Sequence, residues 1–168
     1  MDDLMTICRS GMWRLKYKLS PEGRARYFKE FLPSLHDTKH EVLGNRDDDS
    51  YYLVYIGTRP AAQRMGLAKK LISNVTAMAD CEGRACYLES SFAGNVSYYN
   101  KLGFEVVDKI RLSRAAKAIE LDIMIREPKD DHRIKSTTPF ISEKQAHSVS
   151  LVVKVGNEKT TSACLSLG

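Results

Sequence analysis

Apolar positions in the middle of the chain recur with two different periods, and the change between them predicts the order of the elements. Residues 51–58 are a run of β-branched and aromatic residues, which predicts a buried strand in which Gly57 marks a bulge or the close approach of another group. A helical stripe follows, so we expect a helix that begins after Gly66 and ends at Gly83. The stripe consists of Ala68, Leu71, Ile72, Val75 and Met78.

The rest of this region has the pattern of strand, short helix, strand and strand. We expect a strand over 85–89, a helix over 95–102 that ends at Gly103, and strands over 104–112 and 119–126. The first strands and the helix between them form a βαβ unit with a parallel pair, and the last two strands form a hairpin. The predicted fold class is therefore α/β with a mixed (α+β) sheet.

Residues 1–50 are predicted to be a helical segment. Ser20 to Glu22 have the pattern of a helix start, with an N-cap, a proline and an acid. Apolar residues at helical spacing continue to Gly44 and are interrupted at Pro33. Trp13–Leu19 alternates apolar and basic residues, which favours an edge strand, although the end of an amphipathic helix fits the same residues.

The composition changes after Pro128, which divides the chain into three parts. Residues 129–168 are rich in Ser, Thr and Lys, and within them only 149–155 has strand character. We therefore expect an N-terminal segment over 1–50, a core over 51–128 and a disordered tail over 129–168.

Length and charge exclude several classes of protein. The 168 residues suffice for one domain, and 26 basic against 21 acidic residues give a net charge of +5, scattered along the chain. No apolar run is long enough to cross a bilayer, and the acidic start is no secretory signal. Neither the four cysteines nor Asp47–Asp49 have the spacing of metal ligands. We expect an intracellular, cytoplasmic protein with reduced thiols, no metal and no membrane contact, and a nuclear location remains open.

The loop before the second helix carries candidate chemistry. A helix N-terminus presents unpaired N–H groups and partial positive charge, so it attracts phosphate, and the small residues Gly66 and Ala68 allow a diphosphate to come close. A plain tight turn containing a glycine fits the same residues. The loop is neither a P-loop nor a dinucleotide fingerprint, because it lacks their glycines and their Lys-Ser/Thr ending.

Two motifs together resemble the GNAT superfamily of N-acetyltransferases, in particular its fungal members without an assigned substrate. One is the acyl-CoA loop pattern Gln63-x-x-Gly66-x-Ala68, and the other is Tyr99 five residues before Phe104 of Lys-Leu-Gly-Phe. Many members have Gly where Arg64 stands, a departure that should narrow the loop. The resemblance covers 51–128. Because only 50 residues precede it, the half that builds the acceptor site looks N-terminally short.

The resemblance implies a role for each matching residue. The strand end Ile56, Gly57 and Thr58 would pair with pantetheine and polarise the thioester carbonyl. Asn95 would contact the pantetheine arm, Tyr99 would protonate the departing thiolate, and Glu89 is the candidate general base, with a structural acid as the alternative. The residues that would wrap the diphosphate are Gln63, Arg64, Met65, Gly66, Leu67 and Ala68.

The expected function is acetyl transfer from acetyl-CoA to a primary amine of a small molecule or protein. The alternative is a non-catalytic CoA-binding module or truncated enzyme without an acceptor site. A nucleic-acid-binding domain ranks last, because basic and aromatic residues cluster only over 13–18. An exposed apolar sheet edge would favour a homodimer.

Overall fold

Five strands form one mixed sheet in the computed structural model, which describes residues 12–114, 118–129 and 149–155. The order across the sheet is β3-β4-β2-β1-β5, in which β1 and β2 are parallel and every other neighbouring pair is antiparallel. The strands are β1 (Tyr51–Thr58), β2 (Cys86–Ser90), β3 (Glu105–Leu112), β4 (Ile119–Arg126) and β5 (Val149–Val155). The parallel pair, the β3–β4 hairpin and the mixed sheet are as the sequence predicts.

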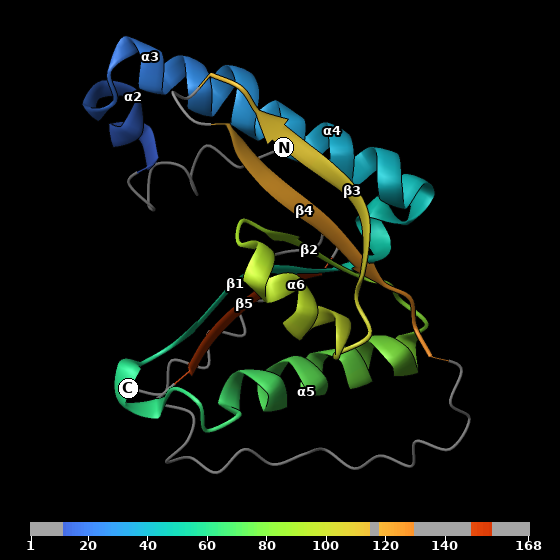
Figure 1. Ribbon diagram of the computed structural model, residues 1–168. Coiled ribbons are helices and arrows are strands. Elements are labelled where there is room, and N and C mark those ends of the chain that lie inside the picture. Colours follow the sequence, from blue (N-terminus) through green and yellow to red (C-terminus); the bar gives the residue numbers. More distant parts are fainter. Residues whose placement is uncertain (1–11, 115–117, 130–148, 156–168) are drawn as a thin grey trace.

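Helices cover both faces of this sheet. In Figure 1, α4 (Leu32–Leu43) lies on one side of the sheet, and α5 (Leu67–Glu82) lies on the other. The short helix α6 (Ala93–Asn100) follows β2 and packs into the same core as α5. Each face of the sheet is therefore buried under its own helical layer.

The two layers enclose two separate cores. The α5-side core contains alternate residues of β1 and β2, among them Tyr51, Cys86 and Leu88, and the aromatic pair Tyr99 and Phe104. The α4-side core takes the intervening residues of the strands, such as Tyr87, Ile123 and Ile125, together with Leu43. This is the division that side chains alternating along a strand produce when both faces are covered.

The N-terminal part is helical throughout its described length. Short helical turns over Met12–Arg14 (η1) and Leu15–Lys18 (α2) occupy the stretch for which alternation favours a strand, so that prediction is wrong and the helical alternative holds. At α3 (Pro21–Arg24) the predicted cap is present, because the Ser20 hydroxyl accepts a hydrogen bond of 3.1 Å from the Gly23 amide.

Pro33 does not stop the helix. A π-helical segment, Ala25–Phe31 (η2), joins α3 to α4, and the Leu32 amide bonds to the Tyr27 carbonyl five residues back. A proline in a regular helix clashes with the carbonyl four residues earlier and donates no hydrogen bond to it. The wider π turn lets the chain remain helical through the proline.

Left-handed glycines end the helices that flank β2, as predicted. Gly83 (φ 67°) follows α5, and Gly103 (φ 89°) follows α6. Phe104 donates its amide to the Tyr99 carbonyl at 3.1 Å and packs its ring 5.9 Å from the Tyr99 ring. One residue of the predicted α5 stripe differs: Met78 is 54% exposed, and the buried stripe continues instead to Thr76 and Ala79.

The predicted strand in the C-terminal part is β5, which pairs with β1 along the whole length of β1. The remaining residues of the expected tail, 130–148 and 156–168, lie outside the described residues. A short 3-10 turn, Gly44–Asp49 (η3), connects α4 to β1, and another, Pro60–Ala62 (η4), follows β1.

Candidate functional site

The parallel strands β1 and β2 separate after three residues. They pair at Tyr51–Leu53 with Cys86–Leu88, and beyond Leu53 no further residue of β1 pairs with β2. Within the described ranges, the rest of β1 pairs only with β5, and the rest of β2 pairs only with β4 (Figure 1). The sheet therefore opens at the carboxyl ends of two neighbouring parallel strands, where ligands of α/β sheets bind.

A bulge turns β1 as it enters this opening. The register of β1 against β5 shifts between Leu53 and Tyr55, so that Val54 is the extra residue. Leu53 and Ile56 consequently both pack against the α5-side core, although strict alternation would place them on opposite faces. Gly57 is not the bulge itself: a Cβ there would lie 2.6 Å from the Tyr55 hydroxyl, so it marks a close approach.

The loop predicted to hold a diphosphate lies between β1 and the N-terminus of α5. Gln63, Arg64, Met65 and Gly66 are all exposed. Arg64 (φ 64°) and Gly66 (φ 73°) both have left-handed backbone conformations, and no side chain caps the helix at Gly66. The first-turn amides of α5 therefore lack the side-chain acceptor that usually satisfies them, which is the arrangement that attracts anions.

Basic side chains surround this helix end. Arg59, Arg64, Lys69 and Lys70 are exposed, and within the described part of the chain none of them forms an ion pair. No acidic residue occurs between Ser50 and Asp80. The potential at the loop is therefore positive, and the helix dipole adds to it.

The loop and Tyr99 lie on the same face of the sheet. Ala62 before the loop and Leu67 after it belong to the α5-side core, together with Tyr99. Leu67 is 5% exposed, so its side chain is a core residue and only its backbone amide can serve a ligand. Ala68 is half-buried in the first turn. Both sequence motifs therefore lie on the α5 side of the sheet, beside the same core.

Tyr99 has the properties of a proton donor. It is 8% exposed, and its hydroxyl makes no hydrogen bond to another described residue. Burial, with a smaller effect of the neighbouring Tyr98, raises the pKa of Tyr99, so the phenol keeps its proton at neutral pH. Asn95, one turn earlier on α6, is exposed and donates its backbone amide to the Phe92 carbonyl at 2.9 Å.

Glu89 lies on the opposite face, at the first position of β2 beyond its pairing with β1. Its Oε2 accepts a hydrogen bond of 2.7 Å from the Tyr52 hydroxyl, whereas its Oε1 is buried and without a partner among the described residues. Burial raises the pKa of Glu89, and the hydroxyls of Tyr52 and Tyr87 oppose this effect in part. Tyr52 holds one carboxylate oxygen, and the Tyr87 hydroxyl lies beside the carboxylate.

A lysine and two tyrosines complete this polar cluster on the α4 side. Lys39 of α4 lies 5.8 Å from the Tyr52 ring centroid and 6.0 Å from that of Tyr87, and its ammonium bonds to Asp47. The Tyr87 hydroxyl is buried beside the Glu89 carboxylate, and burial, with a smaller effect of Glu89, raises its pKa. Neither Tyr52 nor Lys39 was predicted from the sequence. The alternation of Tyr87 and Glu89 along one strand could have shown that these two side chains lie on the same face of the sheet.

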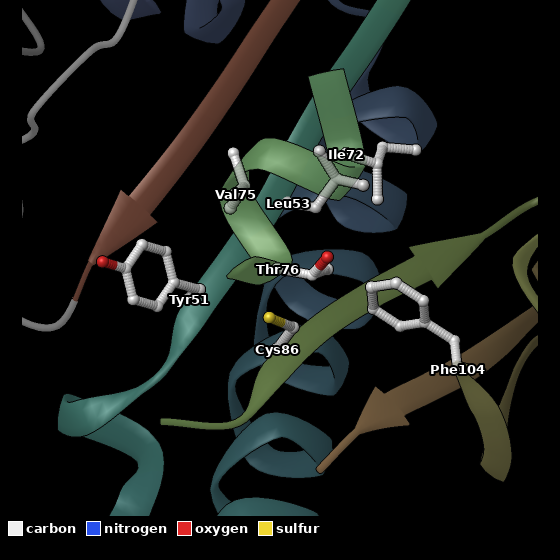
Figure 2. A pocket seen from close by; sticks show the side chains of 7 residues that line it. All are labelled: Tyr51, Leu53, Ile72, Val75, Thr76, Cys86 and Phe104. Atoms are coloured by element: carbon white, nitrogen blue, oxygen red, sulfur yellow. The ribbon is translucent and has the colours of Figure 1, made fainter. Parts of the chain in front are cut away.

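The apolar pocket in Figure 2 is a different place from this opening. It lies under α5 where β1 and β2 are still paired, and most of its lining residues are apolar. The lining residues are Tyr51, Leu53, Ile72, Val75, Thr76, Cys86 and Phe104. Burial raises the pKa of the Cys86 thiol to about 11, which keeps it protonated and unreactive. The pocket is part of the packing of α5 on the sheet.

The described residues provide neither a metal site nor a membrane-spanning helix. No group of His, Cys, Asp and Glu there is arranged to hold a metal ion, and the carboxylates of Asp47 and Asp49 instead pair with Lys39 and Arg84. No helix in the same ranges has the length and apolar character needed to span a membrane.

Comparison with known proteins points to one family. Residues 33–104 match the model of the acetyltransferase (GNAT) family, a match that begins within α4 and ends at Phe104. The chain is 46% identical over 156 residues to an uncharacterized N-acetyltransferase of Schizosaccharomyces pombe. The aligned part covers 92% of this chain and 63% of the length of that relative.

Proposed function

We propose that the chain transfers an acetyl group from acetyl-CoA to a primary amine, because residues 33–104 match the model of the acetyltransferase (GNAT) family and the relative is named an N-acetyltransferase. The observation that carries the proposal is the opening between β1 and β2, with an uncapped helix N-terminus and Tyr99 on one face and Glu89 on the other. Donor and acceptor can then meet within the sheet.

The donor lies along the opening on the α5 side. The amides at the start of α5, with Arg64 and the lysines beside them, bind the diphosphate. In an antiparallel pair, alternate residues of a strand direct their N–H groups to the same neighbour, so the amides of Ile56, Gly57 and Thr58 point alternately to β5 and away from it, into the opening. These amides pair with pantetheine and polarise the thioester carbonyl, and Asn95 contacts the arm from α6.

The acceptor amine enters from the α4 side. Glu89 Oε1 takes one proton from the amine while the nitrogen attacks the thioester carbon. The new C–N bond forms, the C–S bond breaks, and Tyr99 gives its proton to the leaving thiolate sulfur. The buried carboxylate with a raised pKa suits the base, and the protonated phenol suits the acid.

Calorimetric titration with CoA tests donor binding in the intact chain and in Gly66→Glu. The added carboxylate faces the diphosphate, and a like charge in such a place weakens binding by about tenfold or more. Gly83→Glu is the matched control, because Gly83 lies at the other end of α5 with the same left-handed backbone and open space around its Cβ. It should bind CoA like the intact chain.

Two results would count against the proposal. Equal binding by the intact chain and Gly66→Glu, or no binding by either, would remove the loop from the donor site. Binding of CoA without acetyl transfer to any of a broad panel of primary amines would instead identify a non-catalytic CoA-binding module.

A further inference from the structure

The two halves of β1 have different neighbours. Tyr51–Leu53 pairs with β2 on one side and with β5 on the other. Beyond the bulge, residues 55–58 pair with β5 over 149–152 and with no other strand of the described chain. Among the described residues, the half of β1 that borders the opening is therefore hydrogen-bonded to the sheet through β5 alone.

Side-chain packing gives this half of β1 little additional support. Val54 is 43% exposed and Tyr55 is 59% exposed, and Ile56 is the residue beyond the bulge that packs against the α5-side core. Fixing the backbone of each residue costs conformational entropy. A strand segment with few packing contacts needs ladder hydrogen bonds to offset that cost, and for residues 55–58 those bonds go to β5.

The bulge also depends on β5. A bulge exists only relative to a partner strand, and the shift at Val54 is a shift in the pairing of β1 with β5. This shift sets which amides of β1 point to β5 and which point into the opening.

We infer that β5 is a positioning element of the donor site: it holds residues 55–58 of β1 in the orientation that exposes their amides to the thioester arm. β5 lies outside residues 33–104, which match the family model. The inference rests on the proposed function for the identity of the ligand, but the support of β1 by β5 can be tested without any ligand.

Two single proline variants of the full chain make the test internally controlled. Along an edge strand, every second residue directs its N–H group to the neighbouring strand. Ser150 and Leu151 are consecutive, so one of the variants Ser150→Pro and Leu151→Pro removes a hydrogen bond to β1, and the other removes an N–H group that points away from β1. Both residues face the part of β1 beyond the bulge, opposite Gly57 and Ile56.

The measurements are hydrogen exchange of the amides of 55–58 without ligand, and the dissociation constant for CoA. We expect one variant to exchange faster at 55–58 and to bind CoA about tenfold more weakly, as when only one molecule in ten keeps the binding conformation. The other variant should resemble the intact chain. Exchange in β3, at the far edge of the sheet, reports in both whether the rest of the fold is intact.

Each result decides a separate point. Unchanged exchange at 55–58 in both variants would show that β5 does not hold β1 and would overturn the inference. Faster exchange with unchanged CoA affinity would overturn the role of β5 in the donor site. An intact chain that does not bind CoA would refute the proposed function, whereas the exchange data would still decide whether β5 supports β1.

Discussion

Arg64 combines a strained backbone with a place in the loop proposed to bind the diphosphate. A left-handed conformation costs a residue with a side chain about 1–2 kcal/mol, and Arg64 adopts it at φ 64° in the loop before α5. Such strain persists where the surrounding structure imposes it, and it is concentrated at binding sites. Here it turns the chain into Gly66, the N-cap residue of α5, which has no side-chain cap. The arginine therefore occupies this turn at a cost in strain.

Replacement of Tyr99 tests the general acid. Tyr99→Phe should lower kcat by about 10²–10⁴-fold, because the leaving thiolate then lacks a proton donor. The affinity for CoA and the melting temperature should change little, since the hydroxyl has no partner among the described residues. Tyr98→Phe is the matched control on the same helix, and Tyr98 is 36% exposed. A Tyr99→Phe enzyme with full turnover would contradict the assignment.

The pKa of Glu89 gives a test that separates catalysis from structure. A base acts when deprotonated, so the rate should rise as pH increases through the raised pKa of Glu89, and Glu89→Gln should abolish that rise and lower kcat. Because folding raises this pKa, the associated stabilisation is complete below the unfolded value and is lost as pH rises through the folded value.

The same variant should therefore be at least as stable as the intact chain at pH 7, because the buried carboxylate opposes folding there and the amide still accepts from Tyr52. Thermal unfolding at pH 7 checks this, beside the pH profile of kcat. A variant that is less stable but equally active would make Glu89 a structural acid.

At the scale of elements, local patterns predicted the helices and strands wherever one pattern was dominant. The helix stops at Gly83 and Gly103 and the strand over 149–155 follow from single residues or short runs. The prediction of a strand over Trp13–Leu19 failed because alternation over a few residues fits both a strand and a helix, and only tertiary structure decides between them. The effect of Pro33 was also mispredicted, because a π-helical segment is not evident in a single sequence.

The parts of the candidate site that are contiguous in the sequence could be predicted, whereas the parts that join distant elements could not. The loop over 63–68 and Tyr99 are contiguous motifs, and the structure places both beside one core. The bulge at Val54 arises from the register with β5, a strand distant in sequence, so no pattern near Val54 encodes it. Glu89 contacts Tyr52, and Lys39 contacts Tyr52 and Tyr87. These contacts join three elements, so they could be recognised only in the assembled fold.

At the scale of the whole molecule, a buried ion pair connects the α5 layer to the sheet. Asp80 near the end of α5 and Arg126 at the end of β4 form two hydrogen bonds of 2.7 Å, and their side chains are 8% and 5% exposed. The Lys129 amide donates to the same carboxylate at 2.9 Å. Burial alone would raise the pKa of Asp80, but the hydrogen bonds from Arg126 and Lys129 outweigh it and hold the pKa below its usual range.

Asp80→Asn should destabilise the protein by about 3–5 kcal/mol at pH 7, because it leaves the Arg126 guanidinium buried without a counter-charge. Since folding lowers the pKa of Asp80, the stabilisation is complete above the unfolded pKa of about 3.9 and is lost as pH falls through the folded value. Urea unfolding should thus show a smaller difference in the free energy of unfolding between the variant and the intact chain at pH 3 than at pH 7.

The control is Glu127→Gln, which breaks the exposed Arg46–Glu127 pair. This pair has the same bidentate form, and its loss should cost about 1 kcal/mol or less. An equal decrease in the free energy of unfolding in both variants would mean that burial does not distinguish the two pairs. The pair of Asp80 and Arg126 would then not stabilise the packing of α5 on the sheet.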